Sequence, residues 1–153
     1  MESMNNVETA RVLGSLVQHD INAVYAYDQA IVSTELISLR NQLRQFRDDH
    51  YRHVENLSKV IRALGVVPPE YSQDFMGMLM EGFTAIRGSV GIEGALKALR
   101  SNEEYVMRKY REAYALPFTT NIGELVERNY RDVQHHVEFI EKMLADRIWE
   151  KAA

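Results

Sequence analysis

The sequence predicts an all-α protein, an antiparallel four-helix bundle in which one long crossover joins two helical hairpins. Apolar residues recur every three or four positions over four long segments, which is the spacing of one helix face. The chain has only three prolines and eight glycines, and the breaks in the helical pattern fall at 65–72 and 116–121. No segment shows the alternation of a strand. Two short links and one long one are typical of a bundle with a single crossover.

The first hairpin is predicted over about residues 7–64 from its apolar spacing and its end signals. Its first helix is expected to run over 7–32. Ser33 or Thr34 is expected to cap the second helix, which continues to residue 64 with Gly65 as its stop.

The second hairpin is predicted over about residues 92–149. Its first helix is expected over 92–115, because Pro117 cannot continue a helix. Asn121, followed three residues later by Glu124, resembles a capping box at the start of the last helix.

The crossover is predicted to span residues 65–91 and to contain a short extra helix. The segment "SQDFMGMLMEGFTAIRG" at 72–88 has helical spacing, with Ser72 as cap and Gly88 as stop. Residues 1–153 are therefore expected to form one domain.

The two hairpins are related by an internal repeat with an offset of 83 residues. "HVE" occurs at 53–55 and again at 136–138. One offset serves both helices of each hairpin, so the chain reads as two copies of one hairpin related by an approximate two-fold. The same offset aligns four further pairs: Asp20 with Glu103, Tyr27 with Tyr110, Ala30 with Ala113, and Asp49 with Asp132.

The inward faces of the predicted helices are apolar except at their middles. A lone buried polar group costs about 1–3 kcal/mol, and an unpaired buried charge costs more. Groups at these positions must therefore neutralise one another or share a cation, and carboxylates and neutral imidazoles are metal ligands. We call these five residues the polar layer: Asp20, His50, His53, Glu103 and His136.

Two stretches, "DDHYRH" at 48–53 and "RDVQHH" at 131–136, carry a resemblance to a known superfamily. They resemble the Asp-Glu-x-Arg-His motif of ferritin-like di-metal bundles, which take one carboxylate from each of two helices and Glu-x-x-His from each of the others. The resemblance implies that the polar layer binds metal. It also implies that Asp49 and Asp132 orient the ligand histidines.

The sequence departs from that motif at its two bridging glutamates, where it has His50 and Val133. Neither side chain bridges two metals as a carboxylate does, which argues against efficient di-iron ferroxidase turnover. The first half keeps Asp20, His50 and His53, two histidines and a carboxylate, a set suited to Fe(II), Zn or Mn. We expect one metal ion or two, completed by a ligand from across the bundle.

A second likeness covers "GALKALRSNEEYVMRKYREAYALP" at 94–117 and the crossover before it. This region is similar to the central region of an uncharacterised bacterial four-helix-bundle family within the ferritin-like superfamily. With iron bound, the resemblance implies oxygen or peroxide chemistry, iron handling or protection against oxidative stress.

Two alternatives stay open for the polar layer. Its carboxylates could pair with protonated histidines in a metal-free network, in a helical protein that acts by self-association or partner binding. It could also hold a structural zinc ion. His19 and His135 lie off the inward faces and are expected at the surface, whereas Tyr27 and Tyr110 are expected to pack in the core about two turns from the layer.

Composition excludes several classes of function. A net charge of −4 and interleaved charges give no basic field for nucleic acid, and no apolar stretch approaches the roughly 18 residues of a membrane span. The chain has no cysteine, and no secretory signal is recognisable, so we expect a cytoplasmic protein. The expected partners are further copies of the chain, in a homo-oligomer of two or more, and neither nucleic acid nor a membrane.

Overall fold

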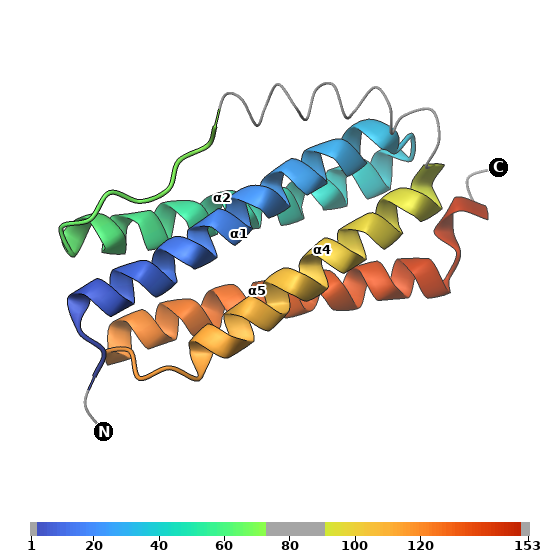
Figure 1. Cartoon of the computed structure of the whole chain (residues 1–153). Coiled ribbons are helices and arrows are strands. Elements are labelled where there is room, and N and C mark those ends of the chain that lie inside the picture. The colour runs from blue at the N-terminus through green and yellow to red at the C-terminus, as the bar shows by residue number, and fades with distance from the viewer. Residues whose placement is uncertain (1–2, 73–90, 151–153) are drawn as a thin grey trace.

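The computed structural model describes residues 3–72 and 91–150, and these form a four-helix bundle (Figure 1). No strand occurs within these ranges, so the predicted all-α bundle is confirmed. The elements are α1 (Asn6–Ser33), α2 (Ile37–Ala63), α4 (Gly91–Tyr114), α5 (Thr120–Ala145) and a short 3₁₀ turn, η1 (Ile148–Glu150).

The helices pair as the sequence predicts. α1 packs along α2, α4 packs along α5, and α1 also packs closely on α4. Figure 1 shows that α1 and α4 run in opposite directions, since α2 ends at one end of the bundle and α4 begins at the other. The short helix predicted over 72–88 lies, after Ser72, outside the described residues. None of the described helices is both long and apolar enough to cross a membrane.

The hydroxyls of Ser33 and Thr34 close α1 and do not cap α2, so the predicted cap is wrong. Each donates a hydrogen bond to the backbone carbonyl four residues earlier, Ser33 to Gln29 and Thr34 to Ala30. The residue before α2 is Leu36, which makes no side-chain cap. Gly65 ends α2 in a left-handed conformation, with φ of 83°, as predicted.

The predicted capping box at the start of α5 is also wrong. Thr119 is the residue before the helix, so Asn121 already lies inside the first turn. At the other end, α5 stops at Ala145, before the predicted residue 149. Arg147 has a positive φ of 47°, which breaks the helix before the 3₁₀ turn.

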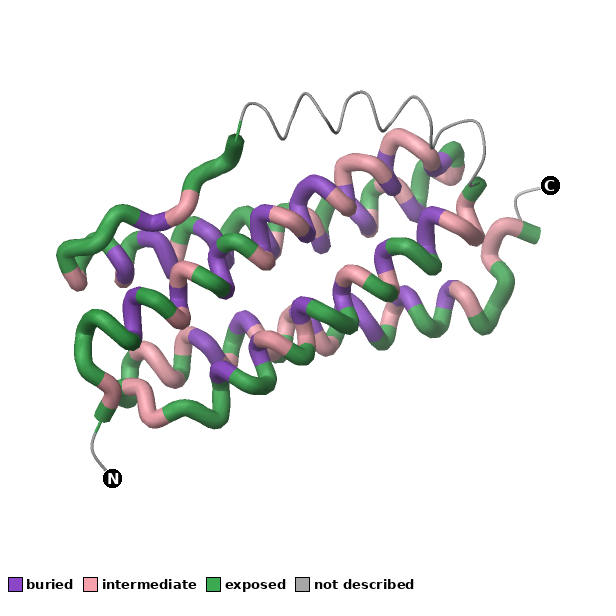
Figure 2. Tube along the Cα trace, viewed as in Figure 1, coloured by how far each residue is buried: buried purple, intermediate pink, exposed green. Residues whose placement is uncertain are grey.

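The buried residues lie on the faces that the four helices turn toward one another (Figure 2). They form two apolar clusters. One contains Leu13, Leu57, Val126 and Val133, and the other contains Leu43, Phe46, Leu96 and Ile140. The nonpolar core therefore consists of two parts, and the polar layer is buried within the same bundle.

Replacing Leu43 by alanine is expected to lower the free energy of unfolding by about 2–5 kcal/mol, because it removes a fully buried side chain and leaves a cavity. Urea unfolding followed by circular dichroism measures the change. Ile37→Ala on the same helix is the control, since Ile37 is 72% exposed and its loss should cost no more than about 0.5 kcal/mol. Equal costs for the two variants would contradict the packing described.

Candidate metal centre

All five residues of the polar layer are completely buried, and they come together from four helices. Each replaces an apolar residue on the inward face of its helix, so helix packing alone carries it into the core. Asp20 lies on α1, Glu103 on α4 and His136 on α5. His50 and His53 lie one turn apart on α2 and share a face. The structure therefore brings together every residue that the sequence predicts.

His50 lies between the two carboxylates of the layer. Its Nδ1 is 2.7 Å from Asp20 Oδ1, and its Nε2 is 2.5 Å from Glu103 Oε1. The imidazole thus connects α1 to α4 at the position where the ferritin-like motif has a bridging glutamate.

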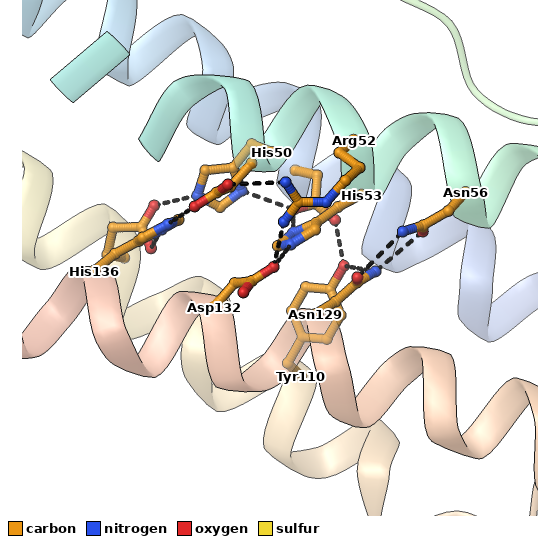
Figure 3. A network of polar contacts seen from close by, with 11 residues as sticks. His50, Arg52, His53, Asn56, Tyr110, Asn129, Asp132 and His136 are labelled. Atoms are coloured by element: carbon orange, nitrogen blue, oxygen red, sulfur yellow. Dashed lines mark hydrogen bonds and ion pairs between the residues drawn. The ribbon is translucent and has the colours of Figure 1, made fainter. Parts of the chain in front are cut away.

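His53 and His136 are held by aspartates of the opposite hairpin. His53 Nε2 lies 2.8 Å from Asp132 Oδ2, and His136 Nε2 lies 2.8 Å from Asp49 Oδ2 (Figure 3). An ionised carboxylate only accepts hydrogen bonds, so each Nε2 carries the proton and donates it. The two aspartates therefore orient the imidazoles, in the arrangement that second-shell carboxylates give to metal-bound histidines.

The Nε2 atoms of His53 and His136 thus donate to aspartates, while their Nδ1 atoms face carboxylates of the layer. His53 Nδ1 is 3.0 Å from Asp20 Oδ1, and His136 Nδ1 is 3.4 Å from Glu103 Oε2. A neutral imidazole would present a lone pair to a carboxylate oxygen at both places. Each contact therefore requires either a second proton on the histidine or a cation.

Arg52 closes the layer on the side between α2 and α5. Its guanidinium is 3.0 Å from Asp49 Oδ1 and 2.7 Å from Asp132 Oδ2. One arginine thus joins the two aspartates that orient the histidines. Its side chain remains 56% exposed, so this ion pair lies at the edge of the layer.

Tyr110 contacts the layer, although we expected it to pack two turns away. Its hydroxyl donates a hydrogen bond to Asp20 Oδ2 and accepts one from the amide of Asn129, 3.4 Å away. Asn129 in turn exchanges amide hydrogen bonds of 3.2 and 3.3 Å with Asn56. The sequence carries a signal for this contact: each layer carboxylate is followed seven residues later by a tyrosine. Because α1 and α4 are antiparallel, that spacing places Tyr110 beside Asp20.

The buried carboxylates are held ionised by the histidines around them. Burial alone would raise the pKa of Glu103, but His50 and His136 lower it to about 2. Burial would likewise raise the pKa of Asp20, and His53 and His50 hold it below its usual value. In return the two carboxylates outweigh the effect of burial on His50 and raise its pKa to about 10.

Without metal, the stability of the protein is expected to fall at both ends of the pH scale. The pKa of Glu103 is lowered from 4.5 to about 2, so its contribution is complete above pH 4.5 and is lost as the pH falls through 2. The pKa of His50 is raised from 6.5 to about 10, so its contribution is complete below pH 6.5 and is lost as the pH rises through 10. Urea unfolding in the presence of a chelator measures both limbs. Stability that stays constant from pH 6.5 to 10 would contradict this assignment.

The two remaining histidines lie outside the layer, as predicted. His135 is exposed, and His19 is half-buried with its ring edge-on to Tyr105. Tyr27 is fully buried, as predicted, but it does not lie two turns from the layer, because its ring is 5.6 Å from that of His50.

Within the described residues, two groups have ligand atoms close enough together to hold a metal ion. One is Asp20 with His50 and His53. The other is His50 with Glu103 and His136. His50 is common to both, so a single imidazole joins two overlapping candidate sites.

The sequence was also compared with known proteins. No curated protein matches the chain. One family matches residues 8–115, a range that contains most of α1, all of α2 and α4, and every residue of the polar layer except His136. This match covers more than half of the chain, which therefore belongs to the family described as a domain of unknown function, DUF2383.

Proposed function

We propose that this protein is a ferritin-like bundle that binds one divalent transition-metal ion in its polar layer. The observation that carries the proposal is the orientation of His53 and His136. Both donate from Nε2 to an aspartate and turn Nδ1 toward a layer carboxylate. An imidazole nitrogen facing a carboxylate oxygen in a dry core is the arrangement from which metal sites are built.

The charge of the region supports a metal ion. Among the described residues, this region holds four carboxylates, the two of the layer with Asp49 and Asp132, and one guanidinium, that of Arg52. Three further positive charges are needed for neutrality. A divalent ion with one imidazolium supplies them, whereas a metal-free layer needs all three histidines protonated.

Three neighbouring imidazoliums are costly because their charges repel in a buried site. The ring of His50 lies 5.1 Å from that of His136 and 5.4 Å from that of His53. At such separations, and out of contact with water, like charges interact strongly. A divalent ion removes this repulsion, because its histidine ligands are neutral.

The donor set of imidazole nitrogens and carboxylate oxygens suits Fe(II), Zn or Mn. With iron, the ion would supply reactivity toward oxygen or peroxide, and the protein would act in iron handling or protection against oxidative stress. The residues of the chain would bind and orient the ion and keep bulk water from it, since the polar layer is fully buried.

One observation favours a second candidate, a metal-free bundle that acts by self-association or by binding a partner. His50 contacts both layer carboxylates at once, and its raised pKa of about 10 describes a protonated bridge between them. In that case the layer would fix the register of the helices, and the function would lie on the surface.

Thermal unfolding with and without added metal separates the two candidates. Anaerobic Fe(II), Zn(II) or Mn(II) at about 100 times its Kd is expected to stabilise the protein by about 2.7 kcal/mol through binding to the folded state. In His136→Ala, which removes a ligand, the stabilisation by metal should be small. The control is His135→Ala at the exposed neighbouring position, which should behave as wild type. A melting temperature that none of the three metals raises would rule the proposal out. If Fe(II) binds, an absorbance change on admitting air then distinguishes oxidation chemistry from structural binding.

A further inference from the structure

We infer that the ion is bound by His50, Glu103 and His136, beside the hydroxyl of Tyr27, and not by Asp20, His50 and His53. We call the first group the Glu103 half of the layer and the second the Asp20 half. This inference rests on the proposed function and deepens it. The sequence favours the opposite half, because Asp20, His50 and His53 keep three ligands on two helices. The contacts within the structure distinguish the two halves.

The Asp20 half is already satisfied by protein groups. Asp20 Oδ1 lies within hydrogen-bond distance of both His50 Nδ1 and His53 Nδ1. Asp20 Oδ2 accepts the Tyr110 hydroxyl, and that hydroxyl accepts the amide of Asn129. Both oxygens of the carboxylate thus have partners. A metal ion here would have to displace hydrogen bonds that already exist.

In the Glu103 half, only one oxygen of the carboxylate has a well-aligned partner, since Glu103 Oε1 lies 2.5 Å from His50 Nε2. Glu103 Oε2, His136 Nδ1 and the Tyr27 hydroxyl are all buried, and none of them makes a well-aligned hydrogen bond to a described residue. The first two atoms lie 3.4 Å apart. Tyr27 is close as well, since its ring centroid lies 5.6 Å from that of His50 and 6.1 Å from that of His136. Buried polar atoms almost always have a well-aligned partner, so three neighbouring atoms that lack one point to a ligand that binds them together.

The asymmetry follows from the internal repeat. With the offset of 83 residues, Asn129 corresponds to Phe46. Asn129 supplies the amide that contacts the Tyr110 hydroxyl, but a phenylalanine has no polar group to offer Tyr27. Phe46 instead lies against the ring of His136, with ring centroids 4.3 Å apart. Like the Asp20 half, the Glu103 half therefore has a carboxylate, a histidine and a tyrosine, but its surroundings are more apolar.

His50 is suited to bind an ion on this side. With an ion bound, its Nδ1 would donate to Asp20 and its Nε2 would offer a lone pair to the ion on the Glu103 side. With His136 Nδ1 and the Glu103 carboxylate it offers two nitrogens and one oxygen donor, and the three ligand atoms lie within 4.8 Å of one another. The ligand class is therefore a single divalent transition-metal ion. His53, paired with Asp20 and Asp132, is left as the imidazolium that completes the charge balance.

The internal repeat provides matched variants for a test with Co(II), whose visible absorption reports its ligands. Glu103→Gln and His136→Gln are expected to weaken Co(II) binding by at least about 100-fold, because each removes a ligand. The counterpart of His136→Gln in the other half, His53→Gln, should weaken it by less than about tenfold. Tyr27→Phe should weaken binding by about tenfold or more and alter the spectrum, whereas Tyr110→Phe should leave the spectrum unchanged.

The outcomes separate this inference from the proposed function. If His53→Gln abolishes binding and His136→Gln retains it, the ion lies in the Asp20 half, so the inference fails while the proposed function stands. If the wild-type protein binds no Co(II), Zn(II) or Fe(II), both fail. If the variants do not fold, anomalous diffraction from Co(II)-loaded crystals of the wild-type protein locates the ion directly. The inference requires the peak to lie nearer His136 Nδ1 than His53 Nδ1, and the reverse would overturn it.

Discussion

Replacing His50 and Val133 together by glutamate is expected to raise the number of metal ions bound per chain from one to two. These are the two positions at which the chain departs from the bridging glutamates of the ferritin-like motif. Both are fully buried, and they correspond under the internal repeat. Two added carboxylates would give each half of the layer a bridging ligand. They would also add two negative charges, which a second divalent ion neutralises.

Metal analysis after loading with Fe(II) or Zn(II) and removal of free ions measures this stoichiometry. The matched control is the double glutamine variant, which has nearly the same shape but cannot neutralise a second ion. In the presence of a chelator, the double glutamate variant should be the least stable of the three proteins, because its buried carboxylates repel one another. A stoichiometry of one ion in both double variants would show that the bridging positions do not determine how many ions bind.

Replacing His50 by alanine is expected to cost about 3–5 kcal/mol of stability when no metal is present, because it removes the partner of a buried charge. His50 contacts Asp20 and Glu103 at once, and no other residue described in the structure lies between these two carboxylates in that way. Their charges would then remain buried with fewer partners, and a cavity would form beside them.

Urea unfolding in chelator, near neutral pH, measures this loss. His135→Ala is the control, since the side chain is an exposed histidine on the neighbouring helix and its removal should change stability by no more than about 0.5 kcal/mol. A cost below about 1 kcal/mol for His50→Ala would mean that the layer does not depend on the imidazole bridge.

Most of the fold could be predicted from the sequence because helical spacing and chain breaks are local signals. The ends of the helices were less predictable. Ser33 and Thr34 each have two possible uses, as a cap for α2 or as donors to the last turn of α1, and the residue type does not distinguish them. At α5, the Asn121 and Glu124 pair matches a capping box, but the helix begins at Thr120. Such choices depend on how the connecting segment packs.

The members of the polar layer could also be predicted, because a charged residue in an apolar stripe is conspicuous and the repeat aligns the pairs. The specific contacts between the atoms of these residues could not be predicted from the sequence. That His53 pairs with Asp132 of the opposite hairpin follows from the crossing of α2 and α5, a tertiary relation. The contact between Tyr110 and Asp20 needed the relative direction of α1 and α4. The difference between the Asp20 half and the Glu103 half lies in the hydrogen-bond partners of buried atoms, which depend on the packed structure.

The central claim, that this bundle binds a metal ion in its polar layer, is tested most directly by metal analysis of protein purified without chelator. The measurement compares the wild type with His136→Ala and His135→Ala. About one transition-metal ion per chain is expected in the wild type and in His135→Ala, and its loss is expected from His136→Ala. Wild-type protein that is metal-free, and that stays so after incubation with Fe(II), Zn(II) and Mn(II), would contradict this claim.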